Sequence, residues 1–150
     1  RDSLADLRGV KGEMLILETR EITLHRPIRM LHPRHPIYIV PRADHRFMVG
    51  ATMIESDDRS LASARSVMEL LSSAYALHAG FADAAVIEIG TDVRPAFTDN
   101  LPRLRRRGRT VHINGLYRHG FLCAPAMAQR AVSLVLDGKP DEEVVDENSD

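Results

Sequence analysis

The sequence predicts an α+β fold, in which a mostly antiparallel sheet with one flanking helix is followed by a C-terminal strand and helix. Three observations predict it. Apolar segments of strand length alternate with turns rich in Pro, Gly and polar residues. Two of these segments are joined by a connection short enough for a hairpin. One longer segment repeats apolar residues at three- and four-residue spacing, which indicates an amphipathic helix.

The first half of the chain contains three predicted strands. Residues 14–17 form a short apolar strand. Residues 37–40 form a second one, with a proline on either side, and residues 46–52 form a third. Because residues 42–45 are a short polar connection, we expect the second and third strands to pair as an antiparallel hairpin.

A helix is predicted over residues 59–78, and Asp57 and Asp58 are placed to cap its N-terminus. We expect its buried stripe to consist of apolar residues three and four positions apart. These residues are Leu61, Ala64, Met68, Leu71 and Tyr75.

The second half starts with a strand over residues 85–93 and is predicted to continue as a proline-containing loop over 94–108. Residues 110–114 form the next predicted strand. A final helix is expected over 125–136, because Pro125 suits the first turn of a helix and a glycine follows the last turn.

Composition excludes several classes of protein. The 150 residues carry a net charge of −1, which gives no global signal for binding nucleic acid or a membrane. The single cysteine, Cys123, excludes an internal disulfide framework and fits a reducing compartment, so we expect a cytoplasmic protein. No metal site is expected, because His32 and His35 lie in a proline-containing segment that cannot align them on a helix.

Charge is distributed unevenly along the chain. Residues 137–150 hold seven of the 21 acidic residues and few apolar ones, so we expect an acidic disordered tail. Residues 103–109 form a dense basic run without interleaved aromatic residues, and we interpret it as a solvated loop. A nucleic-acid-binding module is the least supported of the functions kept open.

None of the nine glycines is two positions away from another. The chain therefore lacks the G-x-G-x-x-G fingerprint, and it also lacks a G-x-x-x-x-G-K-[ST] loop. No loop of these two kinds is present to hold the phosphates of a dinucleotide.

Gly115 and Gly120 bracket a compact turn between the last predicted strand and the last helix. Glycines let the backbone approach a ligand closely, and the following helix directs N–H groups and positive partial charge towards an anion or an electron-rich ring. Arg118 adds a planar cation that suits a carboxylate. The alternative is an ordinary strand–helix turn with a surface arginine.

Three more residues are candidates for a site. Arg94 precedes Pro95 at the end of a predicted strand, where an arginine can hold an anion but is more often solvated. Tyr38 lies within a strand and Met53 follows one, and packing is the ordinary role of both residues. No nucleophile motif or general acid–base pair stands out, which fits hydride chemistry carried by a cofactor.

Four segments, in their order and spacing, resemble the C-terminal half of the D-amino-acid-oxidase-like flavoenzymes, and among these the glycine oxidases. The resemblance covers residues 7–136. The segments are 38–42 (YIVPR), 49–53 (VGATM), 93–102 (VRPAFTDNLP) and 115–125 (GLYRHGFLCAP).

The resemblance implies a division of the chain. Residues 1–93 would form a substrate-binding domain that also faces a partner in an oligomer. Residues 94–136 would return to the FAD-binding domain, and the acidic tail would follow at 137–150. The Rossmann half that holds the dinucleotide would be absent from this chain.

The resemblance also implies an activity. The complete protein would be an FAD-dependent oxidase that deaminates glycine or another small amino acid, with hydride transfer from Cα to flavin N5. The imine product would be hydrolysed to glyoxylate, and oxygen would be reduced to hydrogen peroxide. The reaction would serve the synthesis of the thiazole of thiamine. The implied partners are a small amino-acid substrate, molecular oxygen and further copies of the protein in a homo-oligomer. The resemblance implies no binding to nucleic acid or membranes.

The implied site combines contacts to substrate and to cofactor. Arg94 would pair with the substrate carboxylate, Arg118 would stand beside it, and Tyr38 would place its hydroxyl nearby. Met53 would line the small pocket, and the helix after Pro125 would direct its N-terminus towards the flavin. The residues implied to touch the flavin ring are Gly115, Leu116, Tyr117, Arg118, His119, Gly120, Phe121 and Leu122.

Alternatives stay open. The chain as given would be a catalytically silent substrate-binding domain, because it lacks a loop for the dinucleotide and is not expected to retain FAD. Sarcosine or a small D-amino acid could replace glycine as the substrate, and a dehydrogenase could replace the oxidase.

Overall fold

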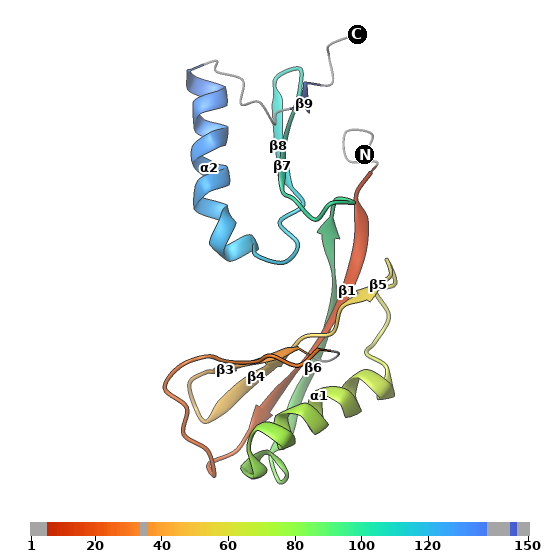
Figure 1. Ribbon diagram of the computed structural model, residues 1–150, viewed down its shortest axis with the longest axis vertical. Coiled ribbons are helices and arrows are strands. Elements are labelled where there is room, and N and C mark those ends of the chain that lie inside the picture. Colours follow the sequence, from red (N-terminus) through yellow and green to blue (C-terminus); the bar gives the residue numbers. More distant parts are fainter. Residues whose placement is uncertain (1–5, 34–35, 138–144, 147–150) are drawn as a thin grey trace. The chain divides into compact units, whose positions relative to one another are not determined.

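The computed structural model describes residues 6–33, 36–137 and 145–146 (Figure 1). These residues form two compact units. One unit consists of residues 11–93, and the other combines residues 6–10 with the described residues from Arg94 onwards. The short segment before residue 11 therefore groups with the second half of the chain.

The 11–93 unit is built on an antiparallel sheet. Its strands follow the order β2-β3-β4-β1-β5, and β6 also pairs with β1. Strands β1 and β6 continue into the other unit. The strands are β1 (Arg8–Glu18), β2 (Ile28–Met30), β3 (Ile37–Pro41), β4 (Arg46–Gly50), β5 (Ile54–Glu55) and β6 (Ala85–Ala96).

The predicted hairpin is confirmed. Strands β3 and β4 pair antiparallel, with Tyr38 opposite Gly50 and Ile39 opposite Val49. Strand β4 ends at Gly50 rather than at residue 52. Strand β1 is longer than the predicted 14–17, because the alternation of buried and half-buried residues extends towards the N-terminus beyond the apolar run.

Helix α1 (Ala64–Leu77) packs against β3 and β4, and it starts later than predicted. Its cap is Ser63, whose hydroxyl accepts a hydrogen bond from the Ser66 backbone N–H at 3.1 Å. The predicted capping role of Asp57 and Asp58 is wrong. The Asp58 carboxylate accepts instead from the Ser60 hydroxyl and the Ser60 backbone N–H, and these contacts lower the pKa of Asp58 to about 2.

The buried face of α1 also differs from the prediction. Leu61, Met68 and Tyr75 are 86%, 64% and 57% exposed, so most of the predicted stripe faces outwards. Packing on the sheet instead buries a neighbouring stripe of the helix, which includes one polar residue. That stripe consists of Ser66, Leu70 and Ala74, with Val67, Leu71 and Leu77 partly buried beside them.

The core of this unit lies between the sheet, helix α1 and the 3-10 helix η2 (Ala79–Phe81). The rings of Phe47 and Phe81 meet edge to face with centroids 5.4 Å apart. The buried residues are Leu15, Leu17, Ile22, Ile37, Ile39, Phe47, Val49, Leu70, Ala74 and Phe81. The α+β fold predicted from the sequence is confirmed.

The second unit contains the antiparallel hairpin of β7 (Arg103–Arg107) and β8 (Thr110–Asn114), with β9 (Val145–Asp146) parallel to β7. Helix α2 (Gly120–Leu136) packs against β8 (Figure 1). The predicted strand over 110–114 is confirmed. Strand β9 lies within the stretch predicted to be a disordered tail, and residues 138–144 and 147–150 lie outside the described residues.

Two predictions for this half are wrong. The predicted loop over 94–108 contains the end of β6 and the whole of β7, in which Arg105 is only 8% exposed. Helix α2 begins at Gly120 rather than Pro125, because the Cys123 N–H donates to the carbonyl oxygen of His119 at 2.8 Å and closes a turn ahead of the proline. Phe121 and Leu122 are therefore helical.

Neither of the described α-helices combines the length and the apolar character needed to cross a membrane.

Candidate functional site

The turn between β8 and α2 starts at a glycine whose backbone no other residue adopts easily. Gly115 has a φ of +78°. A Cβ atom at this position would lie 2.3 Å from Cδ2 of Phe97, a ring that is fully buried. The Gly115 N–H donates to Oδ1 of Asn114 at 2.8 Å. These contacts fix the point from which residues 116–119 leave the sheet.

Three arginines converge on the tyrosine in this turn. The guanidinium carbons of Arg94, Arg8 and Arg118 lie 5.5, 5.9 and 6.0 Å from the centroid of the Tyr117 ring. The structure therefore places the two predicted carboxylate ligands, Arg94 and Arg118, around one half-buried ring. Arg8 is a third cation at this place, and it was not among the site residues predicted from the sequence.

Arg94 is positioned by its strand. It lies near the end of β6, and its Nε donates to the backbone carbonyl of Val10 on β1 at 3.4 Å. The arginine is half-buried, whereas Arg118 is exposed at the turn. The hydrogen bond to Val10 ties the Arg94 guanidinium to the neighbouring strand.

Helix α2 begins directly after this turn. Its N-cap residue, His119, makes no side-chain capping hydrogen bond. The first-turn N–H groups and the positive end of the helix dipole therefore lack a side-chain acceptor at the cap. Phe121 and Leu122 in this turn are 101% and 78% exposed, so apolar surface lies beside the helix end.

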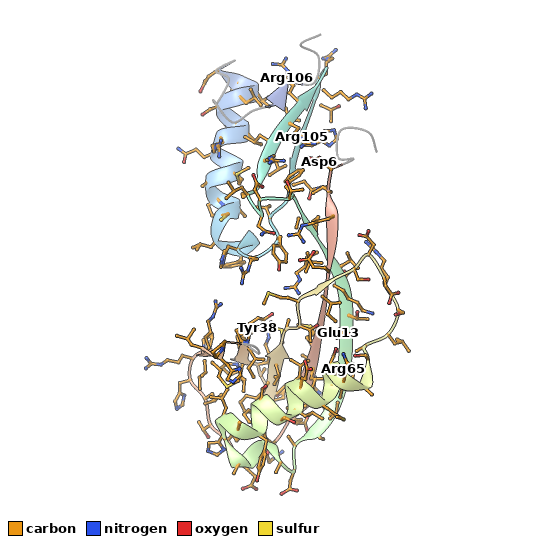
Figure 2. All side chains as sticks on the ribbon, turned by 45° about the vertical axis from the view of Figure 1, so that its right-hand side comes forward. Asp6, Glu13, Tyr38, Arg65, Arg105 and Arg106 are labelled. Atoms are coloured by element: carbon orange, nitrogen blue, oxygen red, sulfur yellow. The ribbon has the colours of Figure 1, made fainter. Side chains whose placement is uncertain are left out.

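An ion pair between a buried arginine and an exposed aspartate lies next to the residues that contact this turn. Arg105 donates through Nη1 and Nη2 to the two carboxylate oxygens of Asp6, each at 2.6 Å. Figure 2 shows Asp6 and Arg105 side by side. The guanidinium carbons of Arg103 and Arg105 lie 4.6 and 4.7 Å from the centroid of Phe97, which in turn contacts Gly115. The basic run predicted to be a solvated loop is thus partly a structural anchor.

This anchor makes stability depend on pH. The hydrogen bonds from Arg105 hold the pKa of Asp6 below its usual value. A lowered pKa in the folded state stabilises the fold above the usual carboxyl pKa, and this contribution is lost as the pH falls through the folded value. We expect Asp6→Asn to lower the free energy of unfolding most near pH 7 and progressively less below about pH 4.

Urea unfolding of the wild type and of Asp6→Asn between pH 2 and pH 7 measures this difference. Asp83→Asn, which replaces an exposed aspartate of the other unit, is the matched control. The same loss from Asp6→Asn at every pH would contradict the role assigned to the ion pair.

Tyr38 and Met53 belong to the 11–93 unit. Tyr38 lies opposite Gly50 on the outward face of β3 and is 36% exposed. A Cβ atom at Gly50 would lie 3.1 Å from the Tyr38 hydroxyl oxygen, so the ring lies across the glycine. The Tyr38 ring can occupy this position because Gly50 has no side chain.

Met53 follows β4, is 44% exposed, and lines a cavity of about 550 Å³. The cavity is formed by the segment around Met53, the start of β3 and the first turns of α1. Tyr38 is not among its lining residues, because neighbouring positions in a strand face opposite sides of the sheet and Ile37 points to the cavity. The structure does not bring these two predicted substrate contacts into one pocket.

No group of three or more metal-ligating side chains occurs in the described parts of the chain.

Comparison with known proteins gives a consistent family. Residues 2–134 match the family described as FAD dependent oxidoreductase (DAO). The chain is 62% identical over 140 residues to a thiamine biosynthesis oxidoreductase, ThiO, of Rhizobium etli, a match that covers 92% of this chain and 43% of that protein. It is 31% identical to the glycine oxidase of Bacillus licheniformis, covering 87% of this chain and 35% of that protein.

A solved structure gives the same result. The crystal structure of glycine oxidase from Geobacillus kaustophilus is similar with a TM-score of 0.75 at 27% identity, covering 92% of this chain and 37% of that one. The chain thus spans less than half the length of the relatives that it matches.

Proposed function

The chain belongs to the FAD dependent oxidoreductase (DAO) family, and from this premise we propose that it is the C-terminal part of an enzyme that oxidatively deaminates glycine or another small amino acid. The observation that carries the proposal is the group of Arg8, Arg94 and Arg118 around Tyr117, next to a helix end without a side-chain cap. Such a group suits a carboxylate beside an electron-rich, negatively polarised ligand.

The proposal divides the chain by role. Residues 1–93 bind the substrate and face a partner in a homo-oligomer, and residues 94–136 complete the FAD-binding domain. The name of the 62% identical relative supports a place in thiamine biosynthesis, where the product would supply the thiazole, and we expect the protein in the cytoplasm.

The residues present fit FAD. The Gly115 turn brings the backbone forward without a side chain at its first position, and the first turn of α2 offers N–H groups next to exposed Phe121 and Leu122. Residues 115–122 would therefore hold the flavin ring. The chemistry that bound FAD supplies is the two-electron oxidation of the amine, with a hydride leaving the substrate Cα.

The task of the chain is then to bind and orient the substrate. Arg94 binds the carboxylate through two parallel N–H bonds, and Arg118 adds a second positive charge beside it. Tyr38 contributes its hydroxyl and Met53 an apolar wall that limits the size of the side chain. This division of labour needs no general acid or base from the chain.

Product formation tests the proposed function. The complete protein, with its upstream region, should carry FAD and release hydrogen peroxide and an oxo acid when glycine, sarcosine or a small D-amino acid is added. The kcat/KM values identify the preferred amine. Oxidation of an amine without peroxide release would indicate a dehydrogenase, whereas a flavin-loaded protein that oxidises none of these amines would contradict the proposal.

The 150-residue chain on its own is expected to be silent and to self-associate. It has no loop for the dinucleotide, so we expect no stoichiometric FAD in the purified chain. Helix α2 exposes Phe121, Val132 and Leu136, which favours association with further copies. The absorbance spectrum and light scattering measure both properties, and a yellow monomer would contradict the expectation.

A further inference from the structure

A buried carboxylate in the 11–93 unit has no part in the proposed function. Glu13 lies on β1, where Figure 2 labels it, and is 1% exposed. Lys11 on the same face is 5% exposed. Alternate residues of a strand share a face, so both stand in the row that continues into the core as Leu15 and Leu17. A charge at such a position must be paired and hydrogen-bonded, and its partners show what it holds.

Three hydrogen bonds join Glu13 to one residue. The Glu13 N–H donates to Oγ1 of Thr52 at 2.9 Å, and the Thr52 hydroxyl donates to Oε2 of Glu13 at 3.1 Å. The Thr52 N–H donates to the Glu13 carbonyl oxygen at 3.1 Å. Thr52 is the direct neighbour of Met53, so Glu13 fixes the segment that carries Met53 to strand β1.

The second carboxylate oxygen reaches helix α1. Oε1 of Glu13 accepts from the backbone N–H of Ser63, the N-cap, at 3.2 Å, and the Lys11 ammonium lies 3.9 Å away. Lys11 also contacts Oδ2 of Asp58 at 3.2 Å. One carboxylate thus ties three elements together: β1, the Met53 segment and the start of α1.

The cavity of about 550 Å³ lies between the Met53 segment and helix α1, two of the elements that Glu13 joins. Ala51, Thr52 and Met53 line it from one side, and Ser63, Ser66 and Leu70 of α1 line it from the other. Space on the α1 side means that close packing alone does not hold the Met53 segment in place. The Glu13 carboxylate is hydrogen-bonded to one residue of each side, Thr52 and Ser63.

We propose that Glu13 is a positioning residue, which fixes the Met53 segment against the cavity and thereby sets the size of the amine that the site accepts. The inference rests on the proposed function, in which Met53 limits the substrate side chain. It adds a residue that acts on specificity through Thr52 and without contact to the substrate.

The test uses the complete flavoprotein with methionine methyl groups labelled with ¹³C. We expect Glu13→Gln to shift the Met53 methyl resonance and to change the ratio of kcat/KM for glycine to that for D-alanine by about tenfold, with the FAD content unchanged. Thr52→Val keeps the buried charge and removes the hydroxyl, so it should produce the same change even if Glu13→Gln folds poorly. Glu18→Gln is the matched control, because Glu18 lies on the same strand in a surface pair with Arg46 at 3.3 Å.

The outcomes separate the two ideas. An unchanged Met53 resonance and an unchanged substrate ratio in both variants would overturn the positioning role, as would lower thermal stability with the same ratio. A shifted Met53 resonance in a protein that oxidises no amine would contradict the proposed function, while the hold of Glu13 on the Met53 segment would be supported.

Discussion

Gly115→Ala is expected to lower the free energy of unfolding by about 3 kcal/mol and to abolish FAD retention in the complete protein. The new Cβ atom would lie 2.3 Å from Cδ2 and 2.6 Å from Cε2 of Phe97. The φ of +78° adds backbone strain for any residue other than glycine. Phe97 cannot easily retreat, since it is fully buried and faces the guanidinium groups of Arg103 and Arg105.

Gly108 provides the matched control. It lies between β7 and β8 with a φ of +57°, and a Cβ atom there would meet nothing within 4 Å. Gly108→Ala should therefore cost only the backbone strain, about 1 kcal/mol, and should leave FAD bound. Urea unfolding and flavin absorbance measure both variants, and equal losses would show that the Phe97 contact is not what fixes the turn.

Arg94→Met is expected to lower kcat/KM for the preferred amino acid by roughly 10²-fold or more, because a desolvated carboxylate loses its charged partner at a cost of about 2–5 kcal/mol. Most of this loss should appear as a higher KM. Methionine keeps much of the length of the side chain, so packing beside the Tyr117 ring changes little. The FAD content should stay normal.

Steady-state kinetics of the complete protein test this expectation. Arg106→Met, on the exposed side of β7, is the matched control and should leave kcat and KM unchanged, since Arg106 is exposed and its Nε donates to the carbonyl oxygen of Gly108 at 3.2 Å. An ordinary KM in Arg94→Met would remove Arg94 from the substrate site.

Local patterns predict the elements whose register is set by neighbouring residues. Pro36 precedes β3 and Pro41 ends it, a four-residue polar connection follows, and the hairpin with β4 forms as expected. Residues 110–114 likewise form β8. In these segments the turn chemistry and the alternation of side chains point to the same structure.

Contacts between distant residues decide the elements that the sequence misassigns. Asp57 and Asp58 match a cap as well as Ser63 does, but Lys11 and Ser60 engage Asp58. Both faces of α1 carry apolar residues, and packing on the sheet decides which face is buried. The arginines of β7 predict a solvent-exposed segment when only neighbouring residues are considered. In the structure Arg105 is buried because it pairs with Asp6, which lies nearly a hundred residues earlier.

The candidate site also depends on contacts between residues that are distant in the sequence. Arg94 and Arg118 were predicted by resemblance, and the structure places both around Tyr117. Arg8 lies far from both in the sequence, so no local pattern could associate it with them. The burial of Glu13 could have been predicted from the sequence, because residues 11 and 13 share a strand face with the apolar residues Leu15 and Leu17.

The most direct test of the account is an anaerobic titration of the complete, FAD-loaded protein with glycine, followed by flavin absorbance. Arg94 and the turn from Gly115 are assigned to orient a small amino acid for loss of its Cα hydride. We therefore expect the oxidised flavin bands to bleach with glycine, sarcosine or a small D-amino acid before any oxygen is admitted. Flavin that stays oxidised with all of these amines would contradict the assignment.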